Sequence, residues 1–234
     1  MNQEIIRINL DGVNCYLVRA NDNFVLFDTG GHLFMDKDFT NRRNNLEKEL
    51  DKAGCKPGNL KLVILTHGDN DHVANACYIK DKYNAKIAMH CDDLELVSSP
   101  NIEKVMENCQ YKSVIYKVVF LFMKKLIKKT LLKVLSDFES FQPDIYIDEN
   151  YSLEEYGVMA KAIHIPGHTL GSIGILMENG DLIAGDTLSN MKNPQLAPNA
   201  YDFKLLIESV NKLRKMNIKT VYPGHGDPFE FVQL

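Results

Sequence analysis

Histidine and aspartate residues concentrate in four short segments of this chain, and each segment also contains glycine. The segments are Thr66-His67-Gly68-Asp69-Asn70-Asp71-His72, Pro166-Gly167-His168-Thr169, Gly185-Asp186-Thr187 and Pro223-Gly224-His225-Gly226. Imidazole and carboxylate groups are the ligands with which proteins bind divalent zinc, iron or manganese. The sequence therefore predicts one metal site, built from six residues: His67, Asp71, His72, His168, Asp186 and His225.

Short apolar runs precede three of these segments and predict the strands that position them. Each ligand is expected just after the end of a strand, where glycine gives the backbone room for a tight turn. Because ligands bind at the carboxyl ends of strands in open α/β sheets, we expect the segments to meet at one sheet edge. The close spacing of His67, Asp69, Asp71 and His72 can divide the ligands between two ions.

The remaining histidines and the cysteines do not lie in segments of this kind. His32, His90 and His164 are expected not to bind metal, although His164, four residues before His168, is a candidate to support the site. Cys91 follows His90, and a small buried side chain is favoured there over a ligand. The five cysteines form no C-x-x-C pair, which favours free thiols in a reducing cytoplasm.

Strands and helices alternate along the chain, which indicates an α/β protein. Strands are predicted at residues 13–18, 24–27, 62–65, 85–89, 161–165, 173–177, 182–184 and 219–222, and helices at 39–53, 72–82 and 202–216. The runs 173–177 and 182–184 are expected to pair as a hairpin. No internal repeat and no proline- or glycine-rich linker divides the chain, so a single domain over 1–234 is expected.

The composition is that of an ordinary globular protein, with 45% hydrophobic and 25% charged residues. A net charge of −4 gives no case for nucleic-acid binding. The first residues contain no basic region followed by an apolar one, so no signal peptide is expected, and a cytoplasmic location is favoured. The longest apolar run, 118–123, is far too short to cross a membrane.

Residues 108–136 depart from this pattern, since they contain seven lysines and no acidic residue. Removing these charges from the net charge of −4 leaves −11 for the rest of the chain. The segment is also apolar, which predicts a basic amphipathic helix or a pair of helices. Three interpretations remain open: a cap with its lysines in water, a lid in which Lys117, Phe120 and Lys124 face an anionic substrate, or a membrane-surface contact. A homodimer surface is a further alternative.

Taken together, the four segments and Phe27-Asp28-Thr29-Gly30 resemble the metallo-β-lactamase superfamily, whose signature is H-x-H-x-D-H followed by a distal His, Asp and His. The resemblance extends over nearly the whole chain. It implies a four-layer αβ/βα sandwich, here with a helical insertion around 92–140. It also implies that His67 and His168 bind a first metal ion, that Asp71, His72 and His225 bind a second, and that Asp186 bridges both. Asp28 would support the ligand loops without binding metal.

Asp69 departs from the family pattern, which usually has a second histidine at this position. If Asp69 binds the first ion, two divalent ions, three aspartates and a bridging hydroxide sum to zero charge. These ligands should weaken the Lewis acidity of the two ions and shift the metal preference of the site from zinc toward manganese or iron. The alternative is that Asp69 caps a helix and never touches metal.

The resemblance and the site favour a dinuclear metal-dependent hydrolase, with two divalent ions, zinc first among them. A bridging hydroxide would attack a small-molecule ester, thioester or lactone, or else a phosphodiester, and Asp71 would orient that hydroxide. One alternative is a non-heme iron redox protein of the same fold. Another is a ligand-sensing or membrane-docking protein with a vestigial site.

Overall fold

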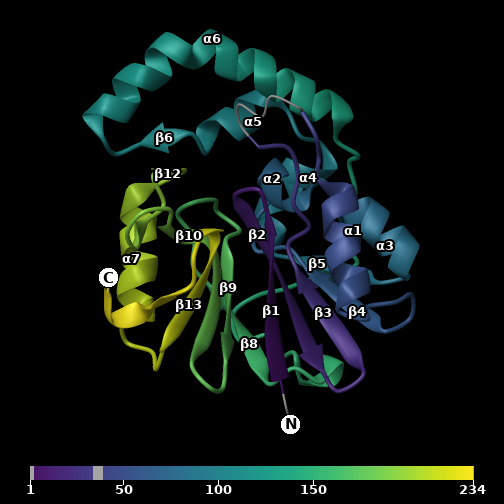
Figure 1. The fold of residues 1–234 in the computed structure, drawn as a ribbon. Helices are drawn as coiled ribbons and strands as arrows, with labels where there is room; N and C mark the ends of the chain where they lie inside the picture. Colours follow the sequence, from purple (N-terminus) through teal and green to yellow (C-terminus); the bar gives the residue numbers. More distant parts are fainter. Residues whose placement is uncertain (1–2, 34–38, 234) are drawn as a thin grey trace.

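Two β-sheets lie face to face in this protein, and helices cover their outer surfaces (Figure 1). The computed structural model describes residues 3–33 and 39–233. The first sheet has the strand order β1-β2-β3-β4-β5-β7. Its strands are β1 (Gln3–Leu10), β2 (Val13–Ala20), β3 (Asn23–Phe27), β4 (Leu60–Ile64), β5 (Lys86–Met89) and β7 (Ile145–Tyr146). It is mixed, because β1 to β3 pair antiparallel and β3, β4, β5 and β7 pair parallel.

The second sheet has the strand order β14-β13-β10-β9-β8, with β11 paired to β10. Its strands are β8 (Ala160–His164), β9 (Ile173–Met177), β10 (Asp181–Asn190), β11 (Gln195–Leu196), β13 (Thr220–Gly226) and β14 (Phe229–Glu230). Within this sheet the pairing of β10 with β13 is parallel, and the others are antiparallel. A short third pair joins β6 (Gln110–Tyr111) to β12 (Asn199–Ala200).

Alternating side chains in the strands build the layers. In β2, Tyr16 and Val18 pack between the two sheets, whereas Cys15 and Leu17 face the helices outside. This two-residue alternation is that of a strand buried on both faces. Burying each large aliphatic side chain stabilises the fold by roughly 1.5–3 kcal/mol.

Helices α1 (Arg43–Lys52) and α3 (Ala76–Tyr83) cover the first sheet, and α7 (Phe203–Leu213) covers the second. The predicted four-layer sandwich is therefore confirmed. Between β5 and β7 lie three further helices, α4 (Leu94–Ser98), α5 (Ile102–Glu107) and α6 (Val114–Asp137), which form the predicted insertion. Figure 1 shows α6 as a single long helix above the edge where both sheets end.

Two predicted helices differ from the observed ones. The helix predicted at 39–53 begins only at Arg43, because Phe39 and Arg42 have positive φ angles that a right-handed helix does not allow. The helix predicted at 72–82 is split into α2 (Asn70–Val73) and α3. The break lies at Asn75, whose side-chain amide donates to the backbone oxygens of Thr29 and Asn41.

Candidate metal centre

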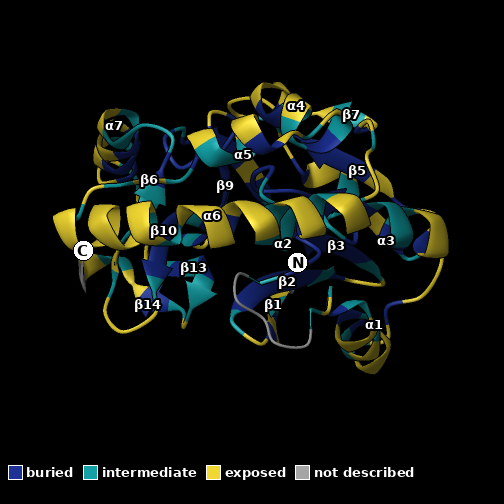
Figure 2. Ribbon diagram, turned by 90° about the horizontal axis from the view of Figure 1, so that it is seen from above, coloured by how far each residue is buried: buried dark blue, intermediate teal, exposed yellow. Residues whose placement is uncertain are grey.

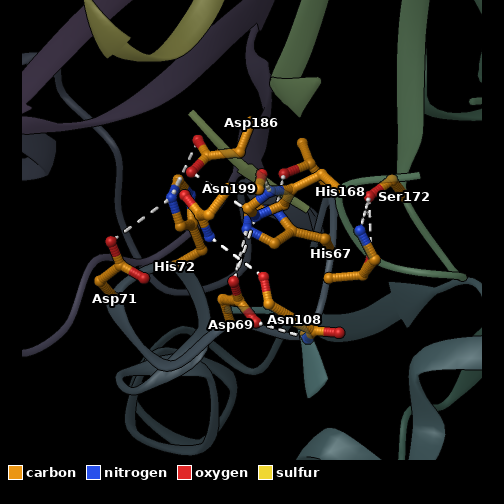
Figure 3. Close-up of polar contacts among 12 residues, drawn as sticks. His67, Asp69, Asp71, His72, Asn108, His168, Ser172, Asp186 and Asn199 are labelled. Atoms are coloured by element: carbon orange, nitrogen blue, oxygen red, sulfur yellow. Dashed lines mark hydrogen bonds and ion pairs between the residues drawn. The ribbon is translucent and has the colours of Figure 1, made fainter. Parts of the chain in front are cut away.

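The six histidines and aspartates predicted as ligands lie together, and Asp69 lies with them. Figure 3 shows His67, Asp71, His72, His168 and Asp186 beside Asp69. The ligand atoms of His67, Asp69 and His168 are all within 4.8 Å of one another, and so are those of Asp71, His72 and His225. Asp186 lies between the two groups. Its Oδ1 atom is 3.3 Å from Nε2 of His72, and its Oδ2 atom is 3.8 Å from Nε2 of His168.

Both sheets supply these side chains at the edge beneath α6. His67 follows β4 of the first sheet, and Asp71 and His72 belong to the short helix α2 that comes next. His168 follows β8 of the second sheet. The expectation that every ligand follows the end of a strand is wrong for two residues, because Asp186 lies within β10 and His225 within β13. The pairing of β10 with β13 shifts register on either side of Gly185, which frees Asp186 from a regular ladder.

Two glycines allow the close approach of the ligand segments. A Cβ atom on Gly224 would overlap Oδ1 of Asp186 and lie 2.8 Å from Cε1 of His72. Gly167 has a φ angle of +139°, and a Cβ atom there would overlap the backbone nitrogen of Leu206 in α7. Both positions therefore require glycine for steric reasons.

Each of the four ligand histidines has a hydrogen-bond acceptor at Nδ1. Nδ1 of His72 contacts Oδ2 of Asp28 at 2.9 Å. Nδ1 of His168 contacts the backbone oxygen of Asn199 at 3.1 Å, and Nδ1 of His225 contacts the backbone oxygen of Gly12 at 2.7 Å. These acceptors assign the proton to Nδ1 in each ring.

Nδ1 of His67 also has an acceptor, the hydroxyl oxygen of Thr66. Thr66 Oγ1 donates its only proton to Asp28, at 2.8 Å, so it accepts from Nδ1 of His67 at 3.0 Å. All four Nε2 atoms are thus left to face the centre of the site, as in histidines that bind a metal.

Asp28 lies beside His72, on the side of the ring that bears Nδ1. Its carboxylate accepts from the backbone nitrogen of Thr66, from the Thr66 hydroxyl and from His72. It thereby joins the end of β3 to the loop after β4 and orients His72. The side chain contacts the outer side of the His72 ring, away from Nε2.

The carboxylates and imidazoles shift one another's pKa values. Burial lowers the pKa of His67 to about 4, helped by the nearby His72 and His168. Burial also lowers the pKa of His168, but the hydrogen bond and charge of Asp69 outweigh it and raise the value to about 9. Burial is likewise outweighed at His72 and His225, where Asp186 and Asp71 raise the pKa well above its ordinary value. The site therefore attracts positive charge, whether as protons or as metal ions.

The positions of the ligand atoms suit bound metal ions better than they suit a network of hydrogen bonds alone. Nε2 of His67 and Oδ1 of Asp186 are buried and have no hydrogen-bond partner among the described residues. Buried polar atoms without partners are costly, so a bound cation explains both. Neighbouring ligand atoms lie 3.1–4.0 Å apart. A tetrahedral ion with ligands at about 2.0–2.1 Å requires a spacing of about 3.3 Å.

Asp69 stands at the N-cap of α2 but makes no capping hydrogen bond with its side chain. The carboxylate instead lies 3.1 Å from Nε2 of His168 and accepts from the Asn108 amide. Despite burial, these contacts lower its pKa to about 2. The structure therefore speaks against the capping alternative, and metal binding by Asp69 stays a prediction.

Asp93 supports the site without belonging to any predicted segment. Its buried carboxylate accepts from the backbone nitrogens of Gly68 and Gly171 and from the Thr169 hydroxyl. Burial raises the pKa of Asp93 to about 6 against these hydrogen bonds. Asp93 thus joins the loop of His67 to the loop of His168, and no sequence signal marks it because its partners are distant in the chain.

Asn14 and Tyr16 in β2 give the end of β13 around His225 similar support. The Asn14 amide donates to the backbone oxygens of Pro223 and Gly226, and the Tyr16 hydroxyl donates to that of Pro223. These side chains were also missed, since nothing local distinguishes them from other strand residues.

A cavity of about 340 Å³ lies between the ligand side chains and α6. Its floor includes Asp69, Asp71, His168, Asp186 and His225. Its roof is formed by residues of α6, of which Phe120, Ile127, Leu131 and Val134 are apolar and Thr130 is polar.

The predicted lid residues divide between the roof and the outer surface. Phe120 lines the cavity, whereas Lys117 and Lys124 are exposed and do not. The expectation that these lysines face a substrate in this cavity is therefore wrong.

The other histidines lie apart from the ligand groups. His32 lines the cavity wall and pairs with Asp137 at the end of α6, at 2.6 Å. His90 and His164 stack on each other with ring centroids 4.0 Å apart, and Nε2 of His164 contacts the Leu170 oxygen. His164 is thus directed toward His90 and Leu170 rather than toward a predicted ligand, so its supporting role is not seen.

The family model of the metallo-beta-lactamase superfamily matches residues 8–225, which include every predicted ligand. The chain belongs to the metallo-beta-lactamase superfamily. Among curated members, a "probable metallo-hydrolase" of Methanocaldococcus jannaschii is 29% identical over 95% of this chain and 93% of its own length. A hydroxyacylglutathione hydrolase of Haemophilus influenzae is 28% identical over 97% of this chain and 91% of its own length.

Solved structures of the superfamily share the fold. A metallo-beta-lactamase family protein of Thermus thermophilus matches with a TM-score of 0.70 and 20% identity, over 99% of this chain and 75% of the other. A protein crystallised in a di-iron-bound form matches with a TM-score of 0.67 and 18% identity, over 98% of this chain and 96% of the other. Membership and the named relatives support a metal-dependent hydrolase. No helix among the described residues combines the length and the apolar character needed to cross a membrane.

Proposed function

We propose that this protein is a dinuclear metal-dependent hydrolase of small-molecule esters, thioesters or lactones. One observation carries the proposal: four histidines, each held through Nδ1, turn Nε2 toward nearby carboxylates. Asp69 lies beside His67 and His168, and Asp71 beside His72 and His225. Asp186 lies beside His72, His168 and His225. His67, Asp69 and His168 would hold one ion, Asp71, His72 and His225 the other, and Asp186 both. Two ions bound there would supply Lewis acidity toward a carbonyl or phosphoryl oxygen and make water a better nucleophile.

Asp71 is the residue that we expect to orient the attacking water. Its carboxylate lines the cavity, and its Oδ2 atom lies 3.3 Å from Nε2 of His225. The pKa of Asp71 is lowered because His72 and His225 outweigh the effect of burial. The ionised carboxylate can therefore accept a hydrogen bond from water in the cavity.

Ser189 is placed to bind a substrate oxygen. It lies at the cavity wall and is 4% exposed, and its hydroxyl has no partner among the described residues. A buried hydroxyl without a partner is costly, so a ligand atom there would be stabilised by its hydrogen bond.

The walls of the cavity support an apolar substrate portion. Among the described residues, no lysine or arginine lines the cavity, and the α6 residues of the roof are aliphatic or aromatic except Thr130. Such walls bind an acyl chain rather than a highly charged group, which favours acyl esters, thioesters and lactones over phosphodiesters. Thioester hydrolysis also agrees with the name of the Haemophilus influenzae relative.

Zinc is the ion that we expect first, because imidazole and carboxylate ligands at these spacings suit it. The third carboxylate, from Asp69, keeps manganese and iron in competition. With iron the same site can support redox chemistry, and a redox-active spectrum of protein purified without added metal would favour that alternative.

The test is hydrolysis of matched acyl esters, thioesters and lactones with short and long chains, after loading with zinc, manganese or iron. Wild-type protein should hydrolyse at least one class and prefer the longer chains. Asp71→Ala should lower kcat by about a thousandfold. Asp92→Ala removes an exposed carboxylate that does not line the cavity and should leave kcat unchanged. Equal activity of the wild type and Asp71→Ala would overturn the proposal.

A further inference from the structure

The first half of α6 exposes an unusual amount of apolar surface. We define the apolar ridge as six residues of this half: Val114, Ile115, Val118, Val119, Leu121 and Phe122. Their exposed fractions range from 45% for Val118 to 86% for Phe122. Of the fourteen exposed large hydrophobic residues in the described chain, nine belong to α6. Contiguous apolar surface of this kind usually marks a binding face.

The cavity does not account for the ridge. Phe120, Ile127, Leu131 and Val134 turn one face of α6 toward the cavity. The ridge residues occupy the opposite face and the flanks, given the rotation of about 100° per residue in a helix. Figure 2 shows α6 from above, mostly exposed along its outer side and crossing the molecule. Within the described residues, nothing covers this outer side.

Positive charge surrounds the ridge. Seven lysines lie at positions 112, 117, 124, 125, 128, 129 and 133, and no acidic residue occurs from 108 to 136. Among the described residues, the only ion pair of these lysines joins Lys128 to Glu103, at 3.8 Å. Lys133 lies over the Phe39 ring. The other five ammonium groups make no ion pair with a described residue and can bind anions outside the molecule.

We propose that α6 docks the protein on an anionic lipid membrane, with the apolar ridge in the interface and the lysines on lipid headgroups. A helix with an exposed apolar face and flanking lysines has the character of interfacial helices that lie in the plane of a membrane. Charge decides between this partner and a second copy of the chain. Two copies packed through the ridge would bring two sets of seven lysines together, whereas anionic headgroups neutralise them.

The docked orientation places the cavity directly behind the membrane-facing helix. The roof residues belong to the same helix as the ridge, so α6 separates the lipid surface from the cavity by one helix diameter, about 10 Å. Docking itself requires neither metal nor substrate. A failed hydrolysis assay therefore leaves this proposal testable, and the reverse also holds.

The chain contains no tryptophan, which permits a single-site fluorescence test. Phe122→Trp places the probe on the ridge, and Val232→Trp, at a site 84% exposed, is the matched control. Metal-free full-length protein is mixed with phosphatidylcholine vesicles that contain either no anionic lipid or about one third phosphatidylserine. We expect emission to shift to shorter wavelength only for Phe122→Trp and only with the anionic vesicles.

Charge reversal then tests the lysines. The triple variant Lys124→Glu, Lys125→Glu and Lys129→Glu should reduce co-sedimentation with anionic vesicles by about tenfold or more. The control triple Lys48→Glu, Lys86→Glu and Lys215→Glu changes the net charge equally at exposed sites and should reduce it far less. Equal losses in both triples would overturn the proposal. So would the absence of any vesicle binding, including the case of a dimer in solution that Phe122→Asp dissociates.

Discussion

Nε2 of His168 lies 3.1 Å from Oδ2 of Asp69, although the two residues are 99 positions apart in the chain. The metallo-beta-lactamase superfamily usually has histidine at the position of Asp69. The carboxylate nevertheless reaches the same group of ligand atoms, beside His67 and His168. Asp69 therefore brings a negative charge to the place where a neutral histidine is usual.

Replacing Asp69 tests whether it binds the first ion. Asp69→Ala should lower the metal content from about two ions to about one per chain, because a tetrahedral site loses one of its few protein ligands. Asp69→His should retain two ions and move the alkaline limb of activity to lower pH, since the added negative charge is removed. Elemental analysis after dialysis and a pH profile give both readouts. Unchanged metal content in Asp69→Ala would mean that Asp69 is not a ligand.

Metal binding should strengthen with pH. In the metal-free site His168 has a pKa of about 9, so Nε2 carries a proton at neutral pH that an ion must displace. We expect affinity for zinc to rise by up to about tenfold per pH unit for each displaced proton and to level off above about pH 9. Competition with a chelator at several pH values measures this. An affinity that stays constant from neutral pH up to the pKa of His168 would contradict it.

The same histidine predicts the opposite trend for the stability of metal-free protein. Its pKa is raised above the ordinary 6.5, so its contribution to stability is complete below that pH and is lost as pH rises through about 9. Urea unfolding in the presence of a chelator should therefore show a free energy of unfolding that decreases over this window. His168→Gln should flatten the decrease, and a wild-type curve that rises with pH would refute the assignment.

Asp28 should matter for metal affinity without touching the metal. In Asp28→Asn one oxygen is replaced by a donor NH2 group, which faces either the Thr66 backbone nitrogen or both the Thr66 hydroxyl and Nδ1 of His72. Either orientation removes a hydrogen bond that fixes residue 28 or His72. We expect the affinity for the second ion to fall by about 10- to 100-fold. Isothermal titration compares this variant with Asp22→Asn, an exposed control in the β2–β3 turn. Equal affinities in the two variants would show that Asp28 does not orient a ligand.

Asp93 should stabilise the fold through the ligand loops. Asp93→Ala leaves the buried donors of Gly68, Thr169 and Gly171 without their acceptor, which should cost about 3 kcal/mol or more of unfolding free energy. Asp92→Ala removes the adjacent exposed carboxylate and should cost far less. Urea unfolding of both variants decides, and similar losses would show that Asp93 has no special role.

The sequence predicted the ligands because each lies in a locally encoded segment, beside glycine and near an apolar strand. It also predicted the pairing of β9 with β10, since a short turn joins two apolar runs. It placed Asp186 and His225 after strands that in fact continue through them, because the irregular register of β10 and β13 depends on contacts between strands.

Local sequence patterns could not predict the residues that support the ligands. Asp93 contacts Gly171 across 78 positions, and Asn14 contacts Pro223 across 209, so their roles arise only when distant parts of the chain meet. A lid of Lys117, Phe120 and Lys124 was one of three interpretations of the basic and apolar segment 108–136. Which side chains of the helix reach the cavity depends on its packing: Phe120 lines the cavity, whereas Lys117 is exposed and does not.

The central claim is that side chains from both sheets enclose two metal ions, and anomalous diffraction from metal-loaded crystals tests it most directly. We expect two peaks, one among His67, Asp69 and His168 and one among Asp71, His72 and His225, with Asp186 beside both. Absence of a peak between these groups, or a peak only at His90 and Cys91, would contradict the claim.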